Sequence, residues 1–180
     1  MTESTVADEC FTATLRDGVT VSLRRLGSAD IDAVIALHGA LSGRELYLRF
    51  FTMHPAYLKT LAGKLTDGDG ANYALGAFES GTLIGIANYV LCGKPATADV
   101  AVVVAHDDHL RGVGTVLLRR LAQVARYNGI QHLVADVLTT NDLMFKVLHD
   151  AGLNPRRKTY DSGVVHLEID LAKGHTSAED

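Results

Sequence analysis

Two glycines, Gly112 and Gly114, lie between a short apolar run and a long amphipathic segment, and they mark the strongest candidate ligand site in the chain. Residues 100–104 are rich in valine, which is typical of a strand buried on both faces, and the apolar residues after the glycines recur at helical spacing. The first N–H groups of a helix have no partner inside it, and glycine lets an anion approach them. This order predicts a phosphate or pyrophosphate site on the backbone N–H groups of residues 110–115, unless the glycines serve only the geometry of the turn.

The turn matches only part of the pattern that binds a dinucleotide. A Rossmann turn needs a third glycine, where this chain has Leu117, and it normally follows the first strand of its domain. The acid that such a site needs in the next strand is present as Asp136. A Walker loop is excluded because no Gly-Lys-Ser/Thr follows. A nucleotide-binding oxidoreductase therefore stays as an alternative, based on Asp136 and the two glycines.

Three motifs, in the same order, resemble the GNAT superfamily of N-acetyltransferases. Residues 109–114, HLRGVG, are similar to its acyl-CoA-binding turn, usually Gln/Arg-x-x-Gly-x-Gly/Ala, except that His109 replaces Gln or Arg. Residues 141–153, NDLMFKVLHDAGL, are similar to the second GNAT motif, an asparagine followed by a helix that ends at Gly-Phe. Residues 41–51, LSGRELYLRFF, resemble a segment of the subgroup that contains bacterial protein-lysine acetyltransferases of the Pat type. The resemblance covers about residues 15–171.

The resemblance implies a fold and an activity. The expected fold is mixed α/β: a twisted, mostly antiparallel sheet flanked by helices, with one parallel, splayed strand pair where CoA enters. The implied function is acetyl transfer from acetyl-CoA, as cosubstrate, to a primary amine, for which a protein lysine is the expected acceptor. A small-molecule amine is the alternative acceptor, and a module that binds acyl-CoA as a sensor without turnover is the alternative function.

The resemblance also suggests roles for three site residues. Asp99 corresponds to the acidic residue, usually Glu, that acts as general base in the Pat-like subgroup, and the shorter Asp favours a bridging water. A solvated carboxylate at a strand end is the other interpretation of Asp99. A backbone N–H near Val102 is the expected oxyanion donor. Leu148 stands where many GNATs have the Tyr that protonates the thiolate, so Tyr160 is the candidate replacement.

The cofactor-binding residues implied by the turn and the second motif come from three segments. They are Val102, Val104, His109, Leu110, Arg111, Gly112, Val113, Gly114, Thr115, Asn141 and Met144. Asn141 is expected to hold the pantetheine arm, to cap the following helix, or both. Tyr47 and Arg49 are weaker candidates for the acceptor cleft. The basic residues 156–158 fit a solvated strand start better than a contact to the 3′-phosphate.

Two polar runs invite a metal interpretation, and the sequence supports neither. His106 and His109 flank two aspartates, but no helix or strand spacing brings these side chains together. Residues 66–70, TDGDG, lack the later glutamate and the flanking helices of a calcium loop. The sequence therefore predicts no metal site.

Composition limits the classes of partner. The chain has 180 residues, of which 47% are hydrophobic, and a formal net charge of −4, so there is no basic field for nucleic acid. No apolar run approaches the ~20 residues of a membrane helix, and the N-terminus is unlike a signal peptide. Cys10 and Cys92 form no metal or redox spacing, which fits a reducing cytosol. We expect a cytoplasmic protein, monomeric or homodimeric, with no nucleic acid or membrane partner.

The elements that must position the site follow from periodicity and turn residues. We expect a mobile arm at 1–14, a single domain at 15–172 and a disordered tail at 173–180. Within the domain we expect a strand at 19–23, a helix capped by Ser28, and two helices in 41–65 broken near His54-Pro55. A hairpin at 73–78 and 83–91 precedes the central strand, and the strand at 133–138 should run parallel to it. A helix at 142–151 ending at Gly152 and a hairpin around 161–163 complete the pattern.

Overall fold

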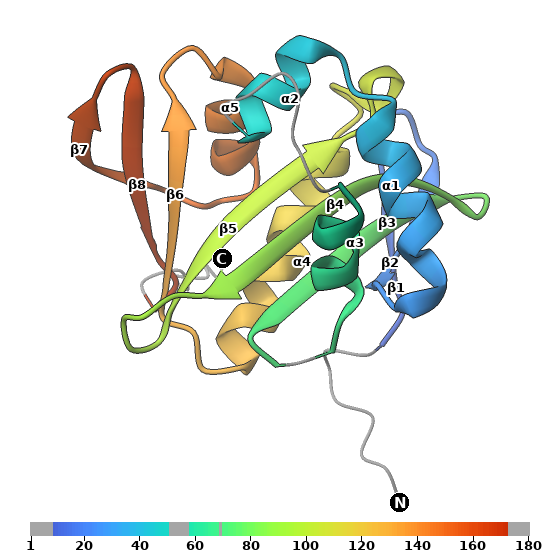
Figure 1. Cartoon of the computed structure of the whole chain (residues 1–180), viewed down its shortest axis with the longest axis horizontal. Helices are drawn as coiled ribbons and strands as arrows, with labels where there is room; N and C mark the ends of the chain where they lie inside the picture. Colours follow the sequence, from blue (N-terminus) through green and yellow to red (C-terminus); the bar gives the residue numbers. More distant parts are fainter. Residues whose placement is uncertain (1–8, 51–57, 69, 173–180) are drawn as a thin grey trace, which may run out of the picture.

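The computed structural model describes residues 9–50, 58–68 and 70–172, with the side chains of 47–50 left out. Within these residues, eight strands form one sheet in the order β1-β2-β3-β4-β5-β6-β8-β7 (Figure 1). The strands are β1 (Phe11–Thr14), β2 (Thr20–Arg25), β3 (Asn72–Glu79), β4 (Thr82–Leu91), β5 (Thr97–Val104), β6 (His132–Leu138), β7 (Arg156–Asp161) and β8 (Val164–Asp170). The helices are α1 (Ile31–Gly39), α2 (Gly43–Phe50), α3 (Leu58–Thr66), α4 (Val113–Tyr127) and α5 (Asp142–Asp150), with 3-10 turns at η1 (Ser28–Asp30) and η2 (His106–Asp108).

One strand pair in the sheet is parallel. β5 and β6 pair from Thr97↔His132 to Asp99↔Val134, and α4 connects them, whereas the other neighbouring strands pair antiparallel. The pairing ends at Asp99 although β5 continues to Val104, and Figure 1 shows the two strands diverging toward α2 and α5. The expected mixed α/β fold, with one parallel and splayed pair, is therefore confirmed.

Helices cover both faces of the sheet and create two apolar cores. Figure 1 shows α1 and α3 on one face of β3 and β4, and α4 on the other. The apolar side of α4, including Leu117 and Leu121, is fully buried. Gly85 of β4 allows this close approach, because a Cβ there would lie 2.9 Å from Val113 Cγ1.

None of the described helices is long and apolar enough to cross a membrane.

Two local expectations near the N-terminus are wrong. Residues 11–14 belong to the expected mobile arm, but β1 pairs with β2 from Phe11↔Leu23 to Thr14↔Thr20. β1 has only four residues and its side chains are mostly exposed, so the alternation of Phe11 and Ala13 with threonine is too short to indicate a strand. Ser28 begins a 3-10 turn, with no side-chain cap, instead of capping α1. The predicted break at His54-Pro55 and the tail at 173–180 lie outside the described residues.

The entry to α1 is held by a buried carboxylate. Asp30 accepts two hydrogen bonds of 2.9 Å from the guanidinium of Arg24 and one of 2.8 Å from the N–H of Gly27. The hydrogen bonds from Arg24 are the main reason why the pKa of Asp30 lies below its usual range. Asp30 is 8% exposed, so its charge is compensated inside the protein rather than by water.

Asp30→Asn is expected to lower the free energy of unfolding by about 1–2 kcal/mol at neutral pH. Because the folded pKa of Asp30 is depressed, its contribution is complete above the unfolded pKa of about 3.9 and is lost as pH falls through the folded value. Urea unfolding should therefore show a difference between wild type and variant that shrinks in acid. Asp32→Asn, at an exposed position of α1, is the control. A difference that grows toward low pH would contradict this account.

Candidate functional site

The N-terminus of α4 has backbone N–H groups without a partner inside the helix, and they line a hollow. Gly112 caps the helix with φ 90°, a left-handed conformation that favours glycine. The first hydrogen bond at this end runs from Val116 N to Gly112 O, so the N–H groups of Val113, Gly114 and Thr115 precede the helical ladder. Among the described residues, no side chain caps them. These N–H groups are the donors that the predicted anion site would use.

Two positively charged side chains line a hollow beside this turn. The sequence alone did not identify either of them as a ligand. The residues that line this hollow include Gly112, Gly114, Arg16 and Lys146. Arg16 and Lys146 each lie 2.7 Å from a carboxylate oxygen of Asp150, which holds both at the rim. No local signal identifies Arg16, because it comes from the loop between β1 and β2, far from the turn in sequence.

The side chain of Arg111 is not among those that line this hollow. Its guanidinium lies 2.6 Å from carboxylate oxygens of Asp17 and Glu79 and 2.5 Å from one of Asp108. These hydrogen bonds, that to Glu79 first, raise the pKa of Arg111. Arg111 can therefore serve an anion only through its backbone, as expected for residues 110–115, while its side chain fastens the turn to the β1–β2 loop and to β3.

One edge of β5 has no strand beside it where β6 diverges. Ala105 N donates to Ile84 O at 2.8 Å, and β4 and β5 pair in continuous register up to Val104. Backbone groups of an antiparallel strand point alternately to either side, so those of Val102 and Val104 face away from β4. The oxygen of Val104 is indeed 3.0 Å from His109 Nε2, outside the β4–β5 ladder. The N–H of Val102 thus points into the space between β5 and β6.

Three adjoining hollows form a continuous groove along this edge. The hollow at the turn shares Val104, His109 and Gly114 with a central hollow that opens to solvent. The central hollow shares Val102, Asn141 and Met144 with a third, between β5 and β6. We call the whole path the groove. It connects the free N–H groups of α4 with the backbone of Val102.

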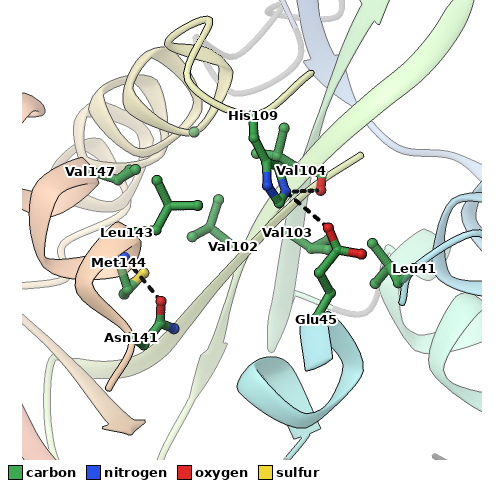
Figure 2. A pocket seen from close by; sticks show the side chains of 11 residues that line it. Leu41, Glu45, Val102, Val103, Val104, His109, Asn141, Leu143, Met144 and Val147 are labelled. Atoms are coloured by element: carbon green, nitrogen blue, oxygen red, sulfur yellow. Dashed lines mark hydrogen bonds and ion pairs between the residues drawn. The ribbon is translucent and has the colours of Figure 1, made fainter. Parts of the chain in front are cut away.

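Helix α5 forms the wall opposite β5. Figure 2 shows Asn141, Leu143, Met144 and Val147 on one side of the central hollow and Glu45 and His109 on the other. Asn141 Oδ1 accepts a hydrogen bond of 3.1 Å from Met144 N, so this side chain caps α5 and also lines the groove. Both functions anticipated for Asn141 are compatible with that position. Leu148 is fully buried in the core between α5 and the sheet.

Asp99 lies on the face of the sheet that α1 and α3 cover at β3 and β4. In register, Asp99 is aligned with Val134 of β6 and Glu168 of β8, and the next row on this face contains Asp136 and His166. His166 Nδ1 lies 2.7 Å from Asp136 Oδ1. The Asp99 side chain is reached by solvent, yet surrounding protein atoms remove enough water to raise its pKa. The charge of Asp136 raises the pKa further, and that of His166 opposes this.

Two of the candidate side chains do not line the groove: Asp99 lies outside its three hollows, and Tyr160 is remote from it. Tyr160 is 70% exposed on β7, and β6 and β8 separate this edge strand from β5. Tyr160 is therefore unsuited to protonate a thiolate near Val102, and the sequence could not reveal this because it does not specify strand order. Tyr47 and Arg49 belong to α2, and their side chains lie outside the described part of the chain.

Glu45 is a wall residue that sequence reasoning missed. It lines the central hollow, and Figure 2 shows its carboxylate pointing toward His109. Ser42 and Glu45 form a reciprocal capping box, with Ser42 N 2.6 Å from Glu45 Oε2 and Glu45 N 3.2 Å from Ser42 Oγ. The spacing Ser-x-x-Glu before an apolar run is the signal that could have placed Glu45 in the first turn of a helix. Burial alone would raise the pKa of Glu45, but hydrogen bonds from Ser42 and His106 outweigh burial and lower it.

Comparisons with known proteins agree with this architecture. Residues 40–152 match the model of the acetyltransferase (GNAT) family. The chain is 32% identical over 161 residues to acetyltransferase Pat of Mycolicibacterium smegmatis, covering 87% of this chain and 47% of that relative, so it spans about half the relative's length. The GNAT domain of S. lividans PAT superposes with a TM-score of 0.79 at 29% identity, covering 89% of this chain and 96% of that one. The structure of yncA from Salmonella typhimurium with acetyl-CoA has a TM-score of 0.65 at 19% identity, covering 88% and 98%. The chain therefore belongs to the GNAT acetyltransferase family.

Proposed function

We propose that this protein transfers an acetyl group from acetyl-CoA to the side-chain amine of a protein lysine. The observation that carries the proposal is the groove, which runs from free N–H groups at a helix N-terminus to a free strand edge. Helix N-termini suit phosphates, and an unpaired strand edge suits the amides of a pantetheine arm. The acetyl-CoA in the structure of yncA and the resemblance to acetyltransferase Pat support the same cosubstrate.

In this proposal different stretches of the groove bind different parts of the cosubstrate. Val113, Gly114 and Thr115 bind the pyrophosphate through their N–H groups, and Arg16 and Lys146 add positive charge at the rim. The pantetheine arm follows β5 past Val104, with Asn141 and Met144 opposite. The thioester carbonyl then meets the N–H of Val102, which stabilises the oxygen as it gains negative charge.

The reaction is a direct attack. A lysine ammonium first gives a proton to Asp99, directly or through a water, because only the neutral amine is nucleophilic. The amine nitrogen bonds to the carbonyl carbon, the carbon–sulfur bond breaks, and CoA leaves as a thiolate. The new amide loses its second proton to solvent or to the thiolate. No side chain in the described part of the groove is needed as an acid, because a thiolate is a stable leaving group.

The charge of the sheet face beside Asp99 supports a cationic acceptor. Asp99, Asp136 and Glu168 lie on this face, in two adjacent rows of three neighbouring strands. Figure 1 shows no described helix in front of β6 and β8, so a protein segment can approach there. A small amine is the second candidate acceptor, because it would be attracted by the same carboxylates.

The test combines a binding assay with an activity assay. A melting-temperature rise with acetyl-CoA and with CoA, but not with NAD, is expected, since a ligand at 100 times its Kd stabilises by about 2.7 kcal/mol. Release of free thiol from acetyl-CoA should then depend on a lysine-containing peptide and exceed release with small amines. Binding without thiol release would favour the sensor function, and a shift with NAD alone would favour the oxidoreductase. Faster release with small amines would change the acceptor.

A further inference from the structure

Two histidines and one glutamate meet where α2 approaches the turn after β5. His106 Nδ1 lies 2.8 Å from Glu45 Oε1, and His109 Nε2 lies 3.5 Å from the same oxygen. The three nitrogen and oxygen atoms all lie within 4.8 Å of one another. Figure 2 shows Glu45 and His109 facing each other on the same side of the central hollow.

The backbone explains why these side chains converge. His106 and His109 are three residues apart, and η2 is a 3-10 turn that begins at His106 and has His109 as its C-cap. Residues three apart eclipse each other in a 3-10 helix, and the two ring centroids are 5.5 Å apart. Glu45 is fixed independently, because Ser42 N occupies its Oε2 and leaves Oε1 for the rings. The cluster is therefore pre-formed by two local motifs far apart in sequence.

The donor set and its dimensions fit a transition-metal ion. Imidazole nitrogen and carboxylate oxygen are common zinc ligands, and two histidines with one carboxylate leave a fourth position open for water. Bonds of about 2.0–2.1 Å to a tetrahedral ion place ligand atoms about 3.3 Å apart, and the observed 2.8 Å and 3.5 Å bracket that separation. The His106 side chain is 71% exposed and that of Glu45 12%, so the site has an entrance on the histidine side and a shielded carboxylate behind it.

The geometry points to a divalent transition-metal site of the zinc type formed by Glu45, His106 and His109 at the mouth of the groove. His109 Nε2 also lies 3.0 Å from Val104 O, to which its proton is donated. Ligation through Nε2 therefore moves that proton to Nδ1 and releases the Val104 oxygen on the free edge of β5. The site does not depend on the proposed acetyl transfer, since none of its evidence concerns the acceptor or the cosubstrate.

The test is a titration of the untagged, chelator-treated protein with Co²⁺, a spectroscopic substitute for Zn²⁺. We expect one ion per chain, visible d–d absorption of a four-coordinate ion, its displacement by Zn²⁺, and a higher melting temperature with either metal. His106→Gln, which changes an exposed side chain and leaves the fold intact by circular dichroism, should weaken Co²⁺ binding at least about tenfold, or about 1.4 kcal/mol. His149→Gln removes an exposed histidine of α5 outside the cluster and should bind Co²⁺ as wild type does.

Two results would overturn the assignment. One is wild-type protein that shows neither d–d absorption nor a metal-dependent melting shift, which would reduce the cluster to an ion pair between α2 and η2. The other is equal Co²⁺ affinity in wild type and His106→Gln, which would assign the binding to histidines elsewhere. Glu45→Gln provides an independent variant, because it keeps the shape of the side chain but removes the anionic ligand, and it should also lose the metal-dependent shift.

Discussion

Replacing Asp99 by asparagine is expected to lower the turnover number for acetyl transfer about a hundredfold or more and to leave acetyl-CoA affinity unchanged. A lysine with a pKa near 10.4 is almost entirely protonated at neutral pH, so the reaction needs a group that accepts its proton. Asp99 lies near the point where β5 and β6 separate, and its raised pKa makes it a better base than an ordinary aspartate. Asparagine has the same shape but cannot accept the proton. Isothermal titration and a thiol-release assay measure the two quantities separately.

The acid limb of the pH–rate profile gives a second readout of the same group. Lost hydration raises the pKa of Asp99, the negative charge of Asp136 raises it further, and the positive charge of His166 lowers it. Turnover should fall as pH drops through this raised pKa, because the base acts in its ionised form. Asp136→Asn should therefore move the acid limb to lower pH, and His166→Gln should move it to higher pH. Glu168, in register with Asp99, and its partner Lys158 at 3.9 Å are unchanged in both variants.

A matched control separates the loss of the proton acceptor at Asp99 from the loss of one negative charge elsewhere on the same sheet face. Glu168→Gln removes a carboxylate from the same row as Asp99, two strands away, and should leave turnover close to wild type. Full activity of Asp99→Asn, or an acid limb that persists in that variant, would remove Asp99 from the mechanism. Loss of acetyl-CoA affinity in Asp99→Asn would instead show that the change disturbs the groove.

Gly114→Val is expected to reduce acetyl-CoA affinity by more than about tenfold, equivalent to at least about 1.4 kcal/mol. Gly114 lines both the hollow at the turn and the central hollow, so a larger side chain enters the path of the cosubstrate. A Cβ at this position would lie 3.2 Å from Val147 Cγ1 and 3.6 Å from Val104 Cγ2, and the two further methyl groups of valine need space that the groove now provides. Isothermal titration with acetyl-CoA measures the effect directly.

Two further variants separate a blocked groove from a damaged fold. Gly63→Ala, in α3, adds a Cβ with no atom within 4 Å and should bind acetyl-CoA normally. Gly114→Val combined with Val147→Ala relieves the contact between α4 and α5 but leaves the valine in the groove. The double variant should therefore recover melting temperature without recovering affinity. Recovery of both would assign the loss to packing, and undiminished affinity in Gly114→Val itself would rule out the groove as the cosubstrate site.

Local patterns predicted most of the fold because each acts over a few residues. The valine run, the glycine turn and the apolar face of α4 appear in the structure as expected, as do both hairpins and the parallel pair. The secondary-structure prediction failed at two places. One is a strand with mostly exposed side chains, and the other is a serine that begins a 3-10 turn instead of capping a helix. β1 is mostly exposed and only four residues long, so its alternation is too short to indicate a strand. Ser28 begins a 3-10 turn that is held by the hydrogen bonds of Asp30 to Arg24 and to Gly27.

The candidate site was less predictable because it depends on contacts between distant segments. The glycine turn and Asn141 were identified from motifs that are contiguous in sequence. Arg16, Glu45 and the orientation of the Arg111 side chain depend on tertiary packing, which brings together residues 32 to 134 positions apart. The remoteness of Tyr160 follows from the order β6-β8-β7, which the length of the connecting loops does not determine.

The edge strand β7 also limits how the sheet can grow. All six of its side chains are exposed, and its first three residues, Arg156 to Lys158, are basic. A sheet edge leaves backbone groups open to pairing with another chain, which is the first step of edge-to-edge aggregation. Two copies joined through β7 would place two runs of positive charge side by side, so electrostatic repulsion protects this edge. Replacing these residues with threonine would therefore threaten colloidal stability more than the folded state itself.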